Sequence, residues 1–333
     1  MGKLNEQGIE DLHTRIISLV RENGRFLVIA HIDPDGDCVG SMLALRAFLK
    51  DMGKDAACYI PGDVPRKYSR ISGMESLLYE DQVDPAEYDV IFTVDVPTLE
   101  RAGGIFDPDR VENIVNIDHH PTNSMFGTVN LVRDDASSTA VLVYHLLTAF
   151  GEGSITSEIA DYLYLGIVMD TGCFRFSNTD AESLEVASRL ISLGARGSEI
   201  AREFYHMKSA SAVKLLGLVL NRLRFYGGER IAIMELTSSM LSECGGRIED
   251  TEGFIDFGTA IEGVELVAFL REIDPGKVRV SLRSLNEHDV SALAEKYGGG
   301  GHTNAAGLMI DLDLKEARGL IADSLLAMLD HSG

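Results

Sequence analysis

Short apolar runs alternate with helical patterns over the first two thirds of the chain. Residues 25–32 (RFLVIAHI) are rich in strand formers, and apolar positions then recur at helical spacing from Val39 to Leu49 before Gly53. Further strands are predicted over 56–60, 88–96 and 111–118, and further helices over 138–150, 156–169 and 181–194. Strands interleaved with helices predict an α/β fold with a doubly wound parallel sheet.

The last third of the chain follows a different order. A polar helical stretch over 197–212 carries no strand signal, and we expect it to link two domains, 1–196 and 213–333. Next come a predicted helix over about 211–225, a strand at 231–236, a hairpin with strands 264–273 and 277–285, and two helices with a closing strand at 308–312. These elements predict a smaller C-terminal α/β domain, and 333 residues suffice for two buried cores.

Composition and charge exclude several classes of protein. Hydrophobic residues make up 45% and charged residues 25%, as in ordinary globular proteins. The net charge of −22 repels long polyanions, so long duplex nucleic acid is not an expected partner. Four scattered cysteines without a C-x-x-C pair indicate a reducing compartment. Without a leader or a membrane-spanning apolar stretch, we expect a cytoplasmic protein that does not bind membranes.

Acidic and imidazole side chains follow three successive predicted strands. The carboxyl ends of strands in an open α/β sheet share one edge, where ligands bind. A single Asp at such a position would usually cap the following helix, but this number of groups is too large for caps alone. The groups are His31, Asp35 and Asp37 at the end of the strand at 25–32, Asp95 at the end of the strand at 88–96, Asp118, His119 and His120 at the end of the strand at 111–118, and Asp170 at the end of an apolar helix.

Two divalent cations would compensate the charge of these carboxylates. We expect the first cation to be held by His31, Asp35 and Asp95, and the second by Asp37, Asp95, His119 and Asp170, with Asp95 shared. Carboxylate and imidazole ligands, with no thiolate expected among them, favour Mn²⁺, although Zn²⁺, Co²⁺ or Ni²⁺ could displace it in vitro.

A glycine run near the C-terminus predicts an anion site. Consecutive backbone N–H groups in such a run can form a nest for a phosphate, and we expect a short helix to follow it. A flexible linker is the alternative. The candidate substrate contacts in this segment are Gly299, Gly300, Gly301, His302 and Asn304.

Several of these segments resemble the motifs of the DHH phosphoesterase superfamily. They are HIDPDGDCVGS at 31–41, VDV at 94–96, DHH at 118–120 and MDTGCF at 169–174, in the order and spacing of the family. The segments RVSLRS at 279–284 and GGGGHTNAAG at 298–307 resemble the DHH-associated substrate-binding domain. The resemblance therefore covers nearly the whole chain.

The resemblance implies roles for the remaining candidates. With His119 on a metal, His120 would stabilise phosphoryl oxygens or protonate the leaving group, and Asp118 would orient the pair. Arg283 and Ser284 would bind substrate phosphate or carboxylate. Arg175 is a further candidate phosphate contact, and an ordinary surface charge is the alternative for it.

The resemblance also implies a metal-dependent phosphoesterase. The chain lacks room for the added domain of RecJ-like exonucleases and lacks the membrane and sensory segments of large cyclic-di-AMP phosphodiesterases, whereas family II pyrophosphatases lack the GGGGH segment. The best match is the group of nano-RNases and pAp phosphatases, which release 5′-mononucleotides from very short RNA and convert 3′-phosphoadenosine 5′-phosphate (pAp) to AMP.

Two other functions stay open. A stand-alone phosphodiesterase for cyclic-di-AMP or for the linear dinucleotides pApA and pGpG is the close alternative. A noncatalytic nucleotide-binding regulator is disfavoured because no expected metal ligand is missing. The expected partners are thus short RNA, pAp or dinucleotides, and a homodimer is left open.

Overall fold

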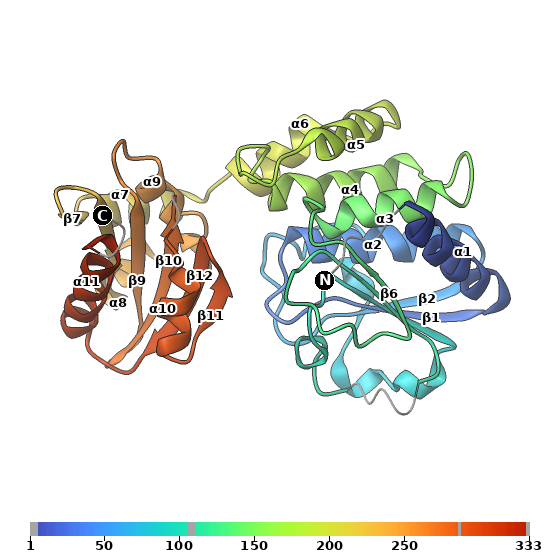
Figure 1. The fold of residues 1–333 in the computed structure, drawn as a ribbon, viewed down its shortest axis with the longest axis horizontal. Coiled ribbons are helices and arrows are strands. Elements are labelled where there is room, and N and C mark those ends of the chain that lie inside the picture. The colour runs from blue at the N-terminus through green and yellow to red at the C-terminus, as the bar shows by residue number, and fades with distance from the viewer. Residues whose placement is uncertain (1–5, 106–110, 286–287, 331–333) are drawn as a thin grey trace. The chain divides into compact units, whose positions relative to one another are not determined.

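The chain folds into two compact units, Met1–Met207 and Lys208–Gly333 (Figure 1). This computed structural model describes residues 6–105, 111–285 and 288–330. The segment expected to link the domains, 197–212, contains α6 (Gly197–Ile200), the π-helical turn η6 (Ala201–His206) and the start of α7 (Ala210–Leu220). Among the described helices, none combines the length and apolar character needed to cross a bilayer.

The first unit contains a six-stranded parallel sheet with the order β3-β2-β1-β4-β5-β6. This is the strand order of a doubly wound sheet, and the order reverses between β1 and β4. The fold class predicted from the sequence is therefore confirmed, although β3 and β6 were not predicted. The strands are β1 (Arg25–Ile29), β2 (Asp55–Tyr59), β3 (Leu77–Leu78), β4 (Val90–Val94), β5 (Ile114–Asp118) and β6 (Val129–Val132).

Five α-helices build the larger core on one face of this sheet. Short 3₁₀ segments, including η4 (Leu99–Ala102), pack against the other face. The helices are α1 (Glu6–Glu22), α2 (Gly36–Asp51), α3 (Thr139–Thr148), α4 (Ser157–Asp170) and α5 (Ala181–Ser192). The α2 and α4 backbones approach closely, since a Cβ on Gly40 would lie 2.3 Å from the Tyr162 carbonyl oxygen.

The second unit contains a mixed six-stranded sheet with the order β11-β12-β10-β9-β8-β7. Only the β8–β9 pair is parallel among its described strand pairs. The strands are β7 (Arg224–Tyr226), β8 (Ile231–Leu236), β9 (Leu266–Asp274), β10 (Lys277–Ser284), β11 (Gly300–His302) and β12 (Ala305–Ile310). Helices α10 (Val290–Lys296) and α11 (Leu314–Asp330) cover one face, and α7, α8 (Ser238–Cys244) and α9 (Ile255–Thr259) pack on part of the other.

Two element boundaries in this unit differ from the prediction. The helix predicted over 211–225 ends at Leu220, because the edge strand β7 begins at Arg224. The last described element is the helix α11 rather than a strand, and the strand predicted at 308–312 overlaps the end of β12.

The glycine run leads into a strand, so the predicted helix after it is wrong. Strand β11 pairs with β12 across the turn at 303–304. A Cβ on Gly299 would lie 2.2 Å from the Gly307 carbonyl oxygen, and a Cβ on Gly301 would lie 2.4 Å from that of Ala305. These two glycines are therefore needed for close backbone contact between the strands.

The close contact of α2 with α4 generates a stability prediction. We expect Gly40→Ala to lower the free energy of unfolding by about 1 to 3 kcal/mol, because the added methyl group overlaps the Tyr162 carbonyl. Gly319 on α11 has no atom within 4 Å of an added Cβ, so Gly319→Ala should raise stability by up to about 1 kcal/mol. Urea denaturation followed by circular dichroism measures both. An unchanged midpoint for Gly40→Ala would contradict this packing.

Candidate metal and active site

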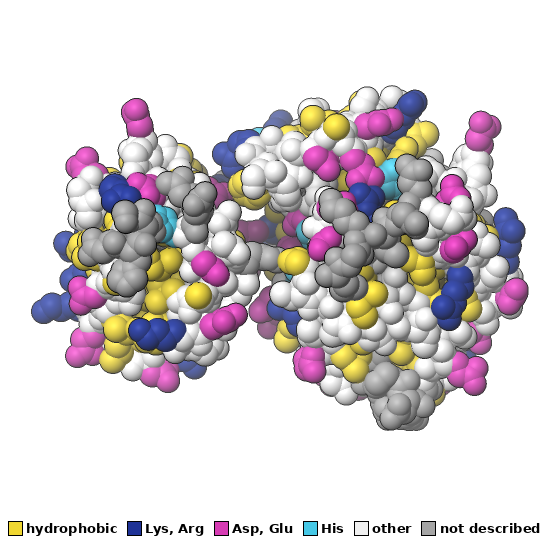
Figure 2. Space-filling view, viewed as in Figure 1, with side chains coloured by type: hydrophobic (Ala, Val, Ile, Leu, Met, Phe, Trp, Pro, Cys, Tyr) yellow, Lys and Arg dark blue, Asp and Glu magenta, His cyan; other side chains and the backbone are white. Residues whose placement is uncertain are grey.

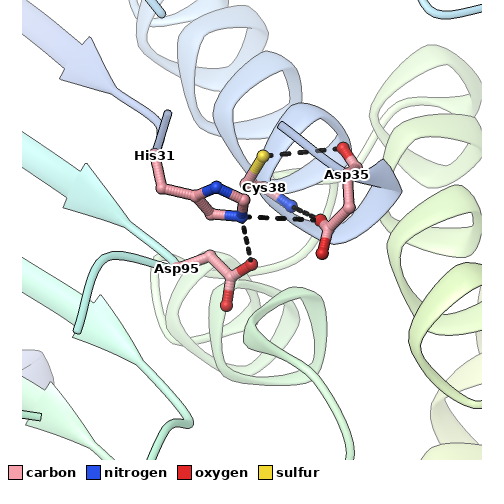
Figure 3. Close-up of side chains that lie close together, drawn as sticks. All are labelled: His31, Asp35, Cys38 and Asp95. Atoms are coloured by element: carbon pink, nitrogen blue, oxygen red, sulfur yellow. Dashed lines mark hydrogen bonds and ion pairs between the residues drawn. The ribbon is translucent and has the colours of Figure 1, made fainter. Parts of the chain in front are cut away.

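The ends of β1 and β4 bring the first predicted set of metal ligands together (Figure 3). His31 follows β1, Asp35 is the N-cap of α2, and Asp95 directly follows β4. The His31 Nε2 atom lies 3.4 Å from Asp95 Oδ2 and 3.8 Å from Asp35 Oδ1. The imidazole and both carboxylates thus face one another at the edge where open α/β sheets bind ligands.

A cysteine thiol, which was not among the expected ligands, also lies in this set. The first turn of α2 directs Cys38 toward its own N-cap, where Sγ donates to the Asp35 carbonyl oxygen at 3.5 Å. Sγ and a ligand atom from each of His31, Asp35 and Asp95 all lie within 4.8 Å of one another. Burial and the neighbouring carboxylates raise the pKa of the Cys38 thiol well above its usual range, so the thiol is neutral.

Three of the four members of the second predicted set also come together, and the fourth, Asp95, contacts one of them. Ligand atoms of Asp37, His119 and Asp170 lie within 4.8 Å of one another. His119 Nε2 is 3.2 Å from Asp170 Oδ2 and 3.5 Å from Asp95 Oδ1. Asp95 therefore contacts members of both sets, as a shared ligand must.

The amino terminus of α3 holds the buried Asp37 side chain. The carboxylate accepts hydrogen bonds from the backbone N–H groups of Thr139 at 2.6 Å and Ala140 at 2.9 Å, and from Ser41 Oγ at 3.2 Å. Burial and the charge of Asp95 nevertheless raise the pKa of Asp37 to about 7. Two N–H donors and a helix dipole thus do not fully offset the negative charge that collects here.

Asp95 has the opposite electrostatic environment. Burial alone would raise its pKa, but a hydrogen bond from His31 and the charges of His119 and His120 hold the pKa well below its usual range. Thr139 Oγ1 also donates to Asp95 Oδ1 at 3.0 Å. The residue adopts a left-handed backbone conformation, with φ of 62°. Its carboxylate is therefore ionised and fixed in place between the imidazoles.

The donor set of this cluster fits divalent cations. Burial disfavours charged imidazoles, yet the surrounding carboxylates raise the pKa values of His31 and His119. Burial and the charge of Asp37 raise the pKa of Asp170 well above its usual range. These groups hold protons that a cation would displace, and mixed oxygen and nitrogen donors suit divalent transition metals.

Asp118 orients the His120 ring. Asp118 Oδ1 lies 2.8 Å from His120 Nδ1 and accepts from the His119 N–H at 2.9 Å. Asp118 Oδ2 accepts from Asn123 Nδ2 at 2.6 Å. The buried carboxylate thereby fixes the plane of the imidazole and raises the pKa of His120 against the effect of burial.

Besides Cys38, three residues of this site were not predicted from the sequence. Arg101 on η4 brings an Nη atom 3.0 Å from His31 Nδ1 and 3.1 Å from the Ile32 carbonyl oxygen. Thr139 and Asn123 hold Asp95 and Asp118, as described above. No local pattern marks Arg101 or Asn123, whereas the N-cap Ser138 could have drawn attention to Thr139.

The predicted substrate contacts fall into two groups. Arg175 stacks over the Tyr205 ring at 5.3 Å and donates to the Tyr205 hydroxyl, and its described contacts do not reach the metal-ligand candidates. In the second unit, the Ser284 N–H donates to the Asn304 carbonyl oxygen at 3.0 Å, and Arg283 pairs in register with Ala305.

The second group therefore lies at one end of the second sheet. Gly300, Gly301 and the backbone of His302 form β11, and Gly299 immediately precedes it. The side chain of His302 lies outside the described part of the structure.

Two family models match the chain. Residues 25–167 match the DHH family, N-terminal domain, and residues 243–326 match the DHHA1 domain. The first match contains five of the six expected metal ligands together with Asp118 and His120, and the second contains Arg283, Ser284 and the glycine run.

Similar proteins match over nearly the full length of the chain. It is 34% identical, over 93% of its length and 92% of the relative, to the bifunctional oligoribonuclease and PAP phosphatase NrnA of Thermus thermophilus. A crystal structure of an exopolyphosphatase-related protein from Bacteroides fragilis superposes with a TM-score of 0.90 at 28% identity, covering 95% of this chain and 96% of the other. The structure of RecJ from Thermus thermophilus in complex with Mn²⁺ shares the fold at 15% identity, with a TM-score of 0.58, over 98% of this chain and 55% of RecJ.

The shared position of Asp95 generates a metal-binding prediction. We expect Asp95→Asn to weaken Mn²⁺ binding by at least about 10-fold, because it removes the charge that both ligand sets contact. Asn is chosen because it tolerates the left-handed backbone. Calorimetric titration and elemental analysis after dialysis measure the effect, with the exposed Asp134→Asn as a matched control. Equal Mn²⁺ content in both variants would contradict a shared ligand.

Proposed function

The chain belongs to the DHH family of phosphoesterases, with an N-terminal DHH domain and a C-terminal DHHA1 domain; we propose that it hydrolyses very short RNA to 5′-mononucleotides and converts pAp to AMP with the help of Mn²⁺. The observation that carries this proposal is the convergence of two oxygen and nitrogen ligand sets on one shared carboxylate, Asp95. The choice of substrates is supported by the 34% identity to the bifunctional oligoribonuclease and PAP phosphatase.

Two cation positions follow from the two ligand sets. His31, Asp35 and Asp95 would hold one cation, and Asp37, Asp95, His119 and Asp170 would hold the other. When bound, such cations neutralise phosphoryl oxygens and make an attacking water more acidic. Mn²⁺ is supported by the donor chemistry and by the Mn²⁺ complex of RecJ, a protein of the same fold.

His120 acts directly on the substrate in this proposal. Its raised pKa keeps a larger share of the imidazole protonated near neutral pH, so it can donate to a phosphoryl oxygen or to the leaving oxygen. Asp118 is a positioning residue that works through His120, because it fixes the ring from the Nδ1 side. Arg101 is likewise a positioning residue for His31, and Thr139 is one for Asp95.

The DHHA1 domain binds substrate in this proposal and takes no part in the metal chemistry. Arg283, Ser284, Asn304, the β11 backbone and His302 offer donors for a phosphate, and none of them belongs to the proposed ligand sets. Arg175, an exposed arginine stacked on Tyr205, would serve as an additional phosphate contact in the DHH domain.

The surface charge supports a preference for short substrates. On the face seen in Figure 2, acidic side chains are scattered over both units and the Lys and Arg side chains do not gather into a continuous track. With a net charge of −22, each further nucleotide adds phosphate charge that the protein surface repels. The sequence also contains no Trp for base stacking.

The substrate assignment is tested by product analysis. We expect Mn²⁺-loaded protein to convert pAp to AMP and RNA of two to about five nucleotides to mononucleotides, with kcat/KM falling steeply toward about 24 nucleotides, beyond the footprint of single-strand binding folds. EDTA should abolish turnover and Mn²⁺ should restore it. Preferential hydrolysis of cyclic-di-AMP or pGpG, assayed in parallel, would favour the dinucleotide phosphodiesterase instead. Rates that rise with RNA length would contradict the proposal.

The role of His120 is tested by separating turnover from metal content. We expect His120→Ala to lower kcat by at least about 100-fold, because it removes a donor to the reacting phosphate. Its Mn²⁺ content should remain that of the wild type. The control is His145→Ala, which removes an imidazole that pairs with Glu182 on α5. Loss of Mn²⁺ from His120→Ala would instead make His120 a metal ligand.

A further inference from the structure

Three arginines share one face of the sheet in the second unit. Arg271 of β9 lies directly opposite Arg279 of β10 in the antiparallel register, so their side chains point to the same face. Arg283 lies four residues beyond Arg279 on the same strand and therefore on the same face. Like charges directly opposite each other destabilise a sheet, so this arrangement requires an explanation.

We call the side of the sheet that carries Arg271, Arg279 and Arg283 the arginine face. The Arg271 side chain makes close contacts on it. Its guanidinium stacks over the Phe269 ring at 5.2 Å, and Nη2 donates to Ser281 Oγ at 2.6 Å. Its Nε atom is buried and has no hydrogen-bond partner within the described structure. A buried donor without a partner is costly, and such groups are usually satisfied by a protein group, a water or a ligand.

Among the described residues, these arginines form no ion pair with a carboxylate. Of the described acidic side chains, only Asp256 is close enough to raise the pKa of Arg283. Burial and the charges of Arg279 and Arg283 lower the pKa of Arg271 to about 10. The chain contains 52 acidic and 30 basic residues, so most arginines could find a carboxylate partner. Three neighbouring arginines without an ion pair therefore indicate an anion-binding site.

The neighbouring strand leaves room for such an anion. The residues of β12 that face Ser281 and Arg283 are Gly307 and Ala305, which have the smallest side chains. Strand β11 of the glycine run lies on the other side of β12. The arginine face therefore borders the segment in which the proposed function locates phosphate binding.

We propose that Arg271, Arg279 and Arg283 bind the terminal phosphomonoester of a short nucleotide, and that Arg271 with Ser281 distinguishes a phosphorylated end from an unphosphorylated one. A terminal phosphate carries close to two negative charges and offers three acceptor oxygens, whereas an internal phosphodiester carries one charge. Three guanidinium groups on one face match the terminal group better. This inference deepens the proposed function and rests on it only for the nature of the ligand.

Equilibrium binding to the chelated full-length protein tests the inference without relying on hydrolysis. Isothermal titration calorimetry in EDTA compares pApA with ApA, which differ only in the 5′-phosphate. We expect the wild type to bind pApA roughly 10-fold or more tightly than ApA, the effect of charge-assisted hydrogen bonds. Arg271→Gln should abolish most of that preference. Lys277→Gln, an equal charge change at the turn of the same hairpin, should retain it.

Thermal unfolding separates ligand binding from a structural role. Without ligand, Arg271→Gln should melt at or above the wild-type temperature, because it relieves repulsion from Arg279. If Arg271→Gln fails to fold, the exposed Arg279→Gln provides the same comparison of pApA with ApA. We expect that variant to lose part of the preference.

Two results would overturn the inference. One is equal affinity of the wild type for pApA and ApA. The other is a preference for pApA that survives in Arg271→Gln, or in Arg279→Gln where that variant is used.

Hydrolysis of pApA and pAp by the Mn²⁺-loaded wild type is measured separately. Absent turnover with an intact phosphate preference would reject the proposed function and leave this inference standing.

Discussion

Mutual repulsion among closely placed carboxylates is the constraint on which the first unit depends. Asp37, Asp95 and Asp170 converge where β4, α2 and α4 begin or end, and burial opposes the charge on each. The crowding shifts the pKa values of these carboxyl groups in opposite directions. Asp95 is surrounded by imidazoles, so its pKa is lowered and it keeps its charge, whereas the pKa values of Asp37 and Asp170 are raised. The amino terminus of α3 and the histidines after β1 and β5 are arranged to limit this repulsion, and bound cations would complete the balance.

One face of the sheet in the second unit has the opposite local charge. This face presents Arg271, Arg279 and Arg283 without carboxylate partners in the described chain, while Arg230 and Arg318 elsewhere in the unit are paired with acids. The metal-ligand candidates of the first unit thus carry a local excess of carboxylates, and one face of the second sheet carries a local cluster of guanidinium groups. Divalent cations would compensate the carboxylates of the first unit, and an anion would compensate the arginines of the second.

The sequence was informative wherever a functional group directly followed an apolar strand, as Asp95 follows β4. It was not informative where contacts depend on the fold. Arg101 reaches His31 from 70 residues away, and Cys38 resembled an ordinary apolar helix position until the turn of α2 directed it toward Asp35. The glycine run predicted an anion-binding nest followed by a helix and not a strand, since the contacts that exclude a side chain at Gly299 arise from strand register. Likewise, only the register of β9 against β10 shows that Arg271 lies opposite Arg279.

The left-handed backbone at Asp95 restricts how this protein can evolve. At φ of 62° most side chains other than those of Gly, Asn and Asp are disfavoured. Asn and Gly keep the backbone but lack the charge, and Glu keeps the charge but strains the backbone and moves its oxygens by a methylene. No single substitution therefore preserves both properties. A lineage that changed its metal chemistry at this position would first have to rebuild the loop after β4, whereas Asp35, with φ of −106°, is under no such restriction.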